Sequence, residues 1–262
     1  MINRRLHGIN RCITLLALLA GALSLPAPLM AEAKLLMTDT VFNFGLAPQD
    51  ARLSRIFWLK SVGDDTLEIF KVIPGCGCTR APLEKNRIAP GDSARLEIIF
   101  NSGKYTGRVV KHPQIQIVSQ FMPQLLKIEA TIVANSKDLS PLRLAPQRLD
   151  ISQIGERVVS EAGFRIVNVS DDDLSLEMLE TARGFLDTHL PARIAAGDSV
   201  ELRMRIAPES LKNSFEKSIT FSATPAAGGE KTVYSMPVTR RYRVYQDEKG
   251  KTLEESRMGS RH

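Results

Sequence analysis

FWLKSVGDDTL at residues 57–67 and FRIVNVSDDDL at residues 164–174 align without a gap, and this pair decides the fold. In each copy an alternating apolar segment runs into a turn of Gly, Ser and Asp, a pattern that predicts a half-buried strand ending in a turn. A second pair, IAPGDS at residues 88–93 and IAAGDS at residues 194–199, follows in the same order. The offsets of 107 and 106 residues equal about one β-sandwich domain. Two copies at so long a period predict tandem domains rather than a solenoid.

Further alternating segments indicate additional strands. The strand candidates of the first copy are Arg55–Lys60, Leu67–Val72, Ala94–Phe100, Gln114–Ser119 and Leu125–Val133. We therefore predict an all-β chain of two tandem immunoglobulin-like β-sandwich domains at residues 34–135 and 142–245. A linker at residues 136–141 would join the two domains, and a polar tail would follow at residues 246–262.

The N-terminus has the pattern of a secretory signal peptide at residues 1–31, with cleavage after Ala31 or Ala33. Its basic residues are Arg4, Arg5 and Arg11. The alternative is an uncleaved membrane anchor. The apolar segment Cys12–Leu25 disfavours it, because it is shorter than the about 20 residues that span a bilayer. Cys12 begins this segment rather than following it, which disfavours a lipoprotein. We expect a periplasmic or extracellular protein with no transmembrane segment after cleavage.

The charge balance gives no basic surface for nucleic acid. The chain has 35 Lys and Arg against 29 Asp and Glu, and three of the arginines lie in the predicted signal peptide. Residues 240–262 carry the remaining excess of three positive charges. A nucleic-acid-binding protein gathers its basic residues on the fold itself. We therefore expect a nearly neutral folded body and no nucleic-acid partner.

Two cysteines remain after cleavage, in the motif Pro74-Gly75-Cys76-Gly77-Cys78-Thr79. The second copy has Glu180–Phe185 in this place, without a thiol. The cysteines are thus an added feature of the first copy rather than a requirement of the scaffold.

The first copy resembles a bacterial family of domains of unknown function, numbered 1573. The resemblance rests on Val41–Gly45, Phe57–Asp65, Pro74–Thr79 and Ile88–Asp92, and it covers roughly residues 37–135. That family is similar to the Ig-like modules of the ASPM–SPD-2–Hydin type. The resemblance implies an exported Ig-like module without an established reaction, and residues 142–245 look like a diverged second copy.

A disulfide between Cys76 and Cys78 is the first hypothesis for the motif. Cysteines at i and i+2 project to the same side of an extended chain, with Cα atoms near the disulfide limit of about 6.8 Å. Gly75 and Gly77 let the chain bend and bring them closer. An oxidising compartment favours the bridge. Closing a three-residue loop contributes about 1.5 kcal/mol, so the bridge would shape a loop rather than hold the domain together.

Metal binding and thiol chemistry are the alternatives. Paired thiolates suit Cu(I) or Zn, and Cu(I) fits better because a structural zinc site needs four ligands. The histidines after the predicted signal peptide are His112, His189 and His262, which are far apart in sequence. A thiol–disulfide oxidoreductase needs a cation or helix N-terminus beside the attacking thiol, and Arg80 is the nearest cation in sequence.

Other motifs are turns or core. Gly103-Lys104 lies between strand candidates and lacks the pattern of a phosphate-binding loop. Asp171–Asp173 occupies the predicted turn rather than a calcium loop. Neighbours in a strand alternate, so Trp58 faces outward if Phe57 faces the core. We predict a non-catalytic exported module, without a cofactor, that binds an envelope protein or assembles in the envelope, through sheet edges or end loops.

Overall fold

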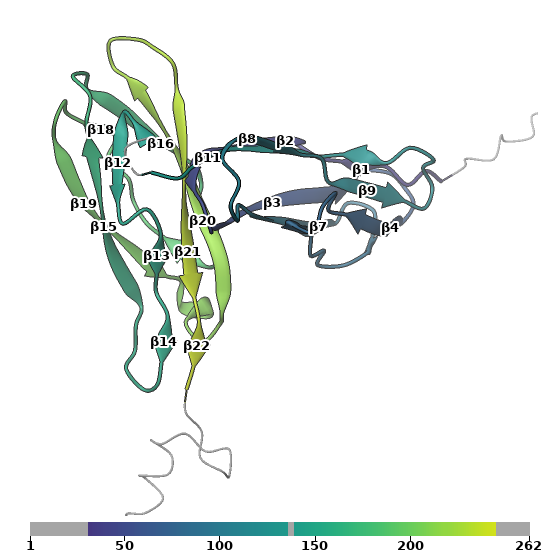
Figure 1. The fold of residues 1–262 in the computed structure, drawn as a ribbon. Coiled ribbons are helices and arrows are strands. Elements are labelled where there is room, and N and C mark those ends of the chain that lie inside the picture. The colour runs from purple at the N-terminus through teal and green to yellow at the C-terminus, as the bar shows by residue number, and fades with distance from the viewer. Residues whose placement is uncertain (1–30, 136–138, 245–262) are drawn as a thin grey trace, which may run out of the picture. The chain divides into compact units, whose positions relative to one another are not determined.

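The computed structural model describes residues 31–135 and 139–244, referred to below as the first half and the second half (Figure 1). The predicted signal peptide up to residue 30, linker residues 136–138 and the predicted tail lie outside the described residues. The described chain is all-β, as predicted, and includes the short 3-10 helix η2 (Pro208–Ser210). No helix in these two ranges is long and apolar enough to cross a membrane.

The strands of the first half are β1 (Leu35–Leu36), β2 (Val41–Pro48), β3 (Arg52–Ser61), β4 (Leu67–Ile73), β5 (Thr79–Arg80), β6 (Arg87–Ile88), β7 (Ser93–Asn101), β8 (Gly107–Lys111), β9 (Gln114–Ile117), β10 (Gln124–Leu125) and β11 (Lys127–Val133). Those of the second half are β12 (Leu142–Ala145), β13 (Leu149–Asp150), β14 (Gln153–Ile154), β15 (Glu161–Asn168), β16 (Leu174–Glu180), β17 (Leu186–Asp187), β18 (Arg193–Ile194), β19 (Ser199–Ile206), β20 (Phe215–Pro225), β21 (Thr232–Arg240) and β22 (Tyr242–Arg243).

The sequence repeat is also a repeat of strand pairing. One four-stranded sheet has the order β1-β3-β7-β5, and another has the order β12-β15-β19-β17. Strand β4 pairs with β6 as β16 pairs with β18, and parallel pairing joins β2 to β11 as it joins β13 to β21. One difference between the halves is that β20 is continuous over 11 residues, whereas β8 and β9 are separated by His112-Pro113.

Three predicted strands are shorter than β3, β4 and β7, and the other two extend beyond or across strands of the structure. The segment Gln114–Ser119 forms β9, which ends at Ile117, and Leu125–Val133 is divided between β10 and β11. The division falls at Leu126, which is fully buried and whose N–H donates to the Pro113 carbonyl at 2.9 Å. This contact takes Leu126 out of the strand ladder.

Each half has its own cluster of buried apolar side chains. Phe57 is 2% exposed in the first cluster, and Phe164, its equivalent in the repeat, is 1% exposed in the second. Trp58 is 55% exposed, so the predicted alternation of Phe57 and Trp58 is confirmed. The aspartates of residues 171–173 lie at the turn before β16, where Asp173 accepts a hydrogen bond from the Ala196 N–H at 2.8 Å.

The two halves meet along β2 and β21, which belong to one sheet and pair at Leu46 and Tyr234. Gly45 stands beside this pair with φ of +64°, and a Cβ at Gly45 would lie 2.0 Å from the Val233 carbonyl oxygen. Only glycine therefore allows the two backbones to approach so closely at this point.

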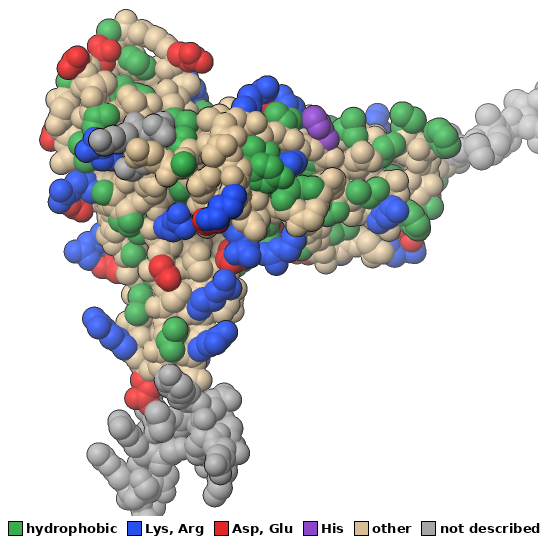
Figure 2. Space-filling model, viewed as in Figure 1, with side chains coloured by type: hydrophobic (Ala, Val, Ile, Leu, Met, Phe, Trp, Pro, Cys, Tyr) green, Lys and Arg blue, Asp and Glu red, His purple; other side chains and the backbone are tan. Residues whose placement is uncertain are grey.

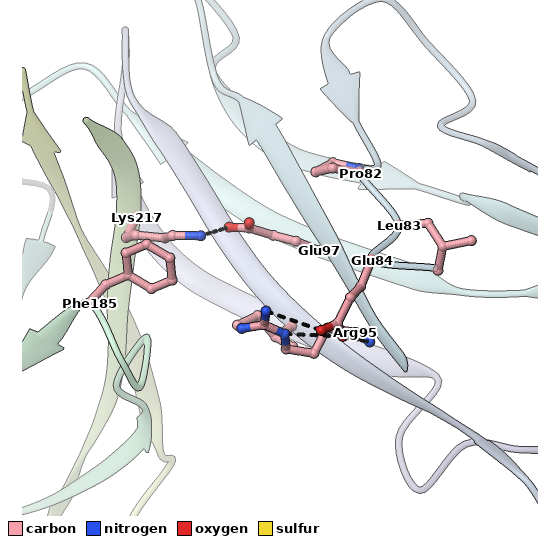
Figure 3. Close-up of a pocket in the computed structure, with 8 residues that line it drawn as sticks. Pro82, Leu83, Glu84, Arg95, Glu97, Phe185 and Lys217 are labelled. Carbon is pink, nitrogen blue, oxygen red and sulfur yellow. Dashed lines mark hydrogen bonds and ion pairs between the residues drawn. The ribbon is translucent and has the colours of Figure 1, made fainter. Parts of the chain in front are cut away.

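Buried polar contacts continue between β3 and β20. The Ser54 N–H donates to Ser218 Oγ at 2.9 Å, and the Ser218 N–H donates to Ser54 Oγ at 3.3 Å. Lys217 Nζ donates to Glu97 Oε1 at 2.6 Å and lies 4.1 Å from the centre of the Phe185 ring (Figure 3). The Lys217 and Glu97 side chains are only 7% and 17% exposed, so water screens this ion pair weakly.

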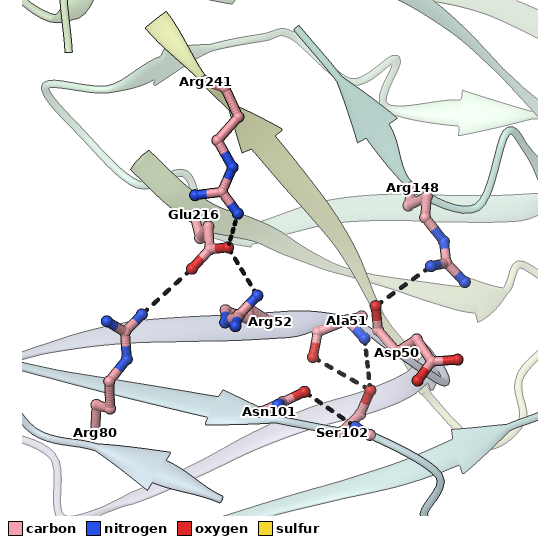
Figure 4. Close-up of polar contacts among 10 residues, drawn as sticks. Asp50, Ala51, Arg52, Arg80, Asn101, Ser102, Arg148, Glu216 and Arg241 are labelled. Carbon is pink, nitrogen blue, oxygen red and sulfur yellow. Dashed lines mark hydrogen bonds and ion pairs between the residues drawn. The ribbon is translucent and has the colours of Figure 1, made fainter. Parts of the chain in front are cut away.

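Glu216 binds three arginines drawn from both halves. Its carboxylate accepts hydrogen bonds from Arg52 at 2.7 Å, Arg80 at 3.3 Å and Arg241 at 2.8 Å (Figure 4). The Glu216 side chain is 11% exposed. Arg80, the cation closest in sequence to the cysteines, is thus engaged by a carboxylate 136 positions away.

The positive excess of residues 240–262 lies on the fold rather than in the predicted polar tail. Arg240, Arg241 and Arg243 make up that excess, and all three lie on β21, β22 or the residue between them. Arg240 is fully buried, and its guanidinium donates to the carbonyls of Ile151 at 2.7 Å and Val159 at 2.9 Å. Burial lowers the pKa of Arg240. Charged and apolar side chains are spread over both halves on the face that Figure 2 shows.

Candidate functional site

A disulfide joins Cys76 and Cys78, with their Cα atoms 5.2 Å apart. The bridged residues lie in the connection between β4 and β5. The Thr79 N–H closes the turn on the Cys76 carbonyl at 3.2 Å. Gly75 has φ of +89°, a left-handed conformation that glycine adopts without strain. Both cysteines are half-buried.

Some of the side chains around the disulfide come from outside the sequence motif. Tyr105 Oη lies 3.8 Å from Cys78 Sγ, and Lys111 Nζ lies 3.3 Å from Tyr105 Oη. Thr79 Oγ1 contacts Cys76 Sγ at 3.3 Å and Cys78 Sγ at 3.8 Å. Lys111 is therefore linked to the sulfurs through the Tyr105 side chain, although it lies more than 30 positions away in sequence.

The disulfide form limits the chemistry of the motif. Neither sulfur is a thiolate, so metal binding and nucleophilic attack by a thiolate both require prior reduction. His112 approaches through its backbone: its carbonyl oxygen would lie 3.3 Å from a Cβ at Gly75. His189 lies in the second half, and His262 lies outside the described residues. In the part of the chain that the structure describes, no group of three or more His, Cys, Asp or Glu residues is placed to hold a metal ion.

A second feature of the first half is an exposed apolar surface where β9 ends, which we call the apolar tip. Its members are Phe70 (68% exposed), Val118 (61%), Phe121 (99%), Met122 (69%) and Leu125 (55%). Phe70, Val118 and Phe121 line a cavity of about 570 Å³. The rest of its lining is also uncharged: Gln116, Ile117, Ser119, Gln120 and Pro123. Figure 2 shows hydrophobic side chains at the surface toward this end of the first half. The sequence signal was Phe121-Met122-Pro123 between two strands, outside either alternating pattern.

The equivalent surface of the second half is polar. Glu177 occupies the repeat position of Phe70 and forms an ion pair with Lys231 at 2.8 Å. The loop between β20 and β21, at residues 226–231, contains Ala226, Ala227, Gly228, Gly229, Glu230 and Lys231. The scaffold therefore does not require an apolar surface at this position.

The edge strands offer little backbone to a partner. β1, β5, β6, β10, β17 and β18 each have two residues, β12 has four and β8 has five. Short edge strands protect a sheet against the addition of another strand. The expected use of sheet edges for binding is therefore less favoured than the use of end loops.

Similar solved structures share little sequence with the chain. The Vibrio cholerae VesB protease is 14% identical with a TM-score of 0.33, over 37% of this chain and 31% of its own, so the chain spans about a third of that protein. A protein of unknown function from Porphyromonas gingivalis W83 is 15% identical with a TM-score of 0.30, over 78% of this chain and 99% of its own. The Pseudomonas aeruginosa CupB2 chaperone is 10% identical with a TM-score of 0.27, over 76% and 98%. Scores this low carry no argument about function.

No curated protein matches the chain. One family does match, and it is described as "Protein of unknown function (DUF1573)". The match covers residues 35–132, which include the disulfide loop and the apolar tip. This part of the chain matches the DUF1573 family.

Proposed function

We propose that the protein is an exported, non-catalytic module that binds another exported protein through the apolar tip. The observation that carries the proposal is a set of five exposed large apolar side chains, three of which, Phe70, Val118 and Phe121, line one uncharged cavity. Contiguous apolar surface on a folded protein marks an interaction site more often than scattered single residues do. The N-terminal signal pattern supports the export part of the proposal.

The lining of the cavity defines the partner. Because it carries no charge, an apolar and uncharged segment fits it without leaving a charge desolvated and unpaired. Full burial of one large apolar side chain contributes about 1.5–3 kcal/mol. Phe121, at 99% exposure, gains most from such burial.

Comparison with the second half supports binding rather than folding as the role of this surface. Phe70 is replaced there by Glu177, and the hairpin loop is polar, although β16 pairs with β20 as β4 pairs with β9. The local register differs: Phe70 lies at a register shift, and Glu177 pairs directly with Ser222. The short edge strands favour contact through side chains over strand addition.

Photocrosslinking in cells that export the full chain tests the proposal. A benzophenone amino acid is placed at Phe121 and, as a matched control, at Ala227, which is exposed in the equivalent loop. We expect one discrete protein adduct from position 121 and none from 227. Mass spectrometry should place the adduct on an apolar, uncharged segment of an exported protein. Phe70→Asp should abolish the adduct, and Phe70→Leu should keep it.

Three results would overturn the proposal. Equal adducts from positions 121 and 227 would show non-specific contact. An adduct with the mass of two chains would assign the apolar tip to self-association. A lipid adduct, or an adduct on a charged segment, would replace the proposed partner with another class.

A further inference from the structure

A cavity of about 870 Å³ lies away from the apolar tip, on the face formed by β3 and β7. The loop before β6 closes one side of it, and the end of β16 with the following loop closes the other. Its volume falls within the range of about 300–1,000 Å³ that is typical of small-ligand sites. None of the preceding proposals uses it.

Trp58 lines this cavity and is the only tryptophan of the chain. Its side chain is 55% exposed, although an indole ring gains considerably from burial. Trp58 stands directly opposite Arg95 in the pairing of β3 and β7, so the two side chains share one face of the sheet. An exposed aromatic face beside a planar guanidinium is a flat platform for a ring.

Ion pairs fix hydrogen-bonding groups around the platform. Glu84 accepts hydrogen bonds from the Arg95 N–H at 2.9 Å and from Arg95 Nε at 3.3 Å, and Lys85 binds Asp92 at 2.5 Å. The pKa of Glu84 is lowered chiefly by its hydrogen bond from the Arg95 backbone, and that of Asp92 chiefly by Lys85. Ionised acceptors and donors therefore alternate beside Trp58.

Arg183 supplies a cation from the second half. It is exposed and lines the cavity, and its side chain makes no ion pair with any residue at positions 31–135 or 139–244. By contrast, Arg55 and Glu180, which also line the cavity, are paired with each other. Arg183 is thus able to bind an acidic group of a ligand without breaking an existing pair.

We propose that this cavity binds a carbohydrate that carries a carboxylate. A sugar ring presents an apolar face of C–H groups that stacks on Trp58, while its hydroxyl groups both donate and accept hydrogen bonds. The mixed rim of Glu84, Arg95, Lys85 and Asp92 matches hydroxyl groups, whereas an acidic peptide would favour a rim of cations alone. Arg183 would bind the carboxylate.

Intrinsic fluorescence provides the test, because the single tryptophan lies in the cavity. The full chain is titrated with the disaccharide of N-acetylglucosamine and N-acetylmuramic acid, which has a carboxylate, and with neutral chitobiose. We expect saturable quenching with both and about tenfold tighter binding of the carboxylated sugar, the effect of one hydrogen bond between charged groups. In Arg183→Ala the two sugars should bind equally well.

Calorimetry extends the test to a chain without its fluorophore. Trp58→Ala should weaken binding of the carboxylated disaccharide at least about tenfold. Phe70→Ala, which removes an exposed aromatic residue outside the cavity, should leave it unchanged. Both replaced side chains are exposed, and circular dichroism checks that the variants keep the fold.

Either of two outcomes would overturn the inference. One is the absence of saturable quenching by either disaccharide at about 10 mM, ten times the Kd of a weak ligand. The other is equal or tighter binding of hexaglutamate, which would assign the cavity to an acidic peptide. Because these measurements do not test protein binding at the apolar tip, their failure would leave the protein-binding proposal standing.

Discussion

The two halves of the molecule form the corresponding connection with and without cysteines, through a hydrogen bond that spans three residues in the first half and four in the second. Thr79 begins β5, and its N–H donates to the Cys76 carbonyl at 3.2 Å. Leu186 begins β17, and its N–H donates to the Ala182 carbonyl, also at 3.2 Å. Backbone hydrogen bonds therefore suffice for the turn, and the disulfide of the first half is an addition to it.

The apolar tip, like the disulfide, is a feature of the first half that the fold does not need. Phe70 on β4 and Glu177 on β16 occupy equivalent positions of the repeat, and only the first half shows an exposed apolar surface there. Features that the fold does not need are thus concentrated in the half that matches the DUF1573 family. The second half contributes a contact surface and, at Arg183, one side of the proposed carbohydrate site.

The largest expected effect comes from breaking the buried ion pair that joins the halves. Lys217→Met keeps most of the alkyl chain but leaves the Glu97 carboxylate without its cation, at 17% exposure. Removing one partner of a buried ion pair costs about 3–5 kcal/mol. Urea denaturation should show this loss in the free energy of unfolding.

Two further variants control that measurement. Lys231→Met breaks the ion pair between Lys231 and Glu177, whose side chains are 45% and 66% exposed. The free energy of unfolding should fall by no more than about 1 kcal/mol. Adding Glu97→Leu to Lys217→Met should recover much of the loss, because no charge is then left buried. A loss in Lys217→Met as small as that in Lys231→Met would show that the halves do not depend on this contact.

These contacts also define what the sequence could predict. Alternation identified β3 and β7 and placed Phe57 inside and Trp58 outside, because strand geometry acts between neighbouring residues. It gave no sign that Lys217 is buried, since the compensating Glu97 lies 120 positions away. The burial of Arg240 could not be predicted for the same reason, because its carbonyl partners come from distant segments.

In the candidate site, too, local sequence predicted the pair of cysteines but not the distant residues around it. The motif identified Cys76 and Cys78 as a pair, because only one residue separates them. It named Arg80 as the nearby cation, whereas Arg80 binds Glu216 and Lys111 reaches the sulfurs through Tyr105. Contacts made by tertiary folding are not encoded in local spacing, so the surroundings of a motif require the structure.

A second prediction concerns the close approach of β2 and β21. Gly45→Ala would place a Cβ 2.0 Å from a carbonyl oxygen and would hold alanine at φ of +64°. The left-handed conformation costs about 1 kcal/mol and the overpacking about 1–3 kcal/mol, so we expect a loss of about 2–4 kcal/mol. Thermal unfolding would measure it.

Gly163→Ala is the matched control in the second half. Gly163 lies in β15, and the nearest contact of an added Cβ would be the Leu202 carbonyl oxygen at an ordinary 3.8 Å. That variant should be unchanged or stabilised by up to about 1 kcal/mol. If both alanine variants unfold like the parent chain, the close backbone approach at Gly45 is not a determinant of stability.

The smallest effect is expected from the disulfide. Replacing Cys76 and Cys78 together by Ser removes a bridge that closes only a three-residue loop, which predicts a loss of about 1.5 kcal/mol. For a chain of this size that corresponds to a fall in Tm of roughly 3–6 °C. Reduction of the parent protein with a small dithiol should produce the same shift.

A loss above about 3 kcal/mol would mean that the first half, unlike the second, depends on its disulfide to form the turn. A loss near the expected value would leave the two halves alike in folding and different only in what the cysteines add.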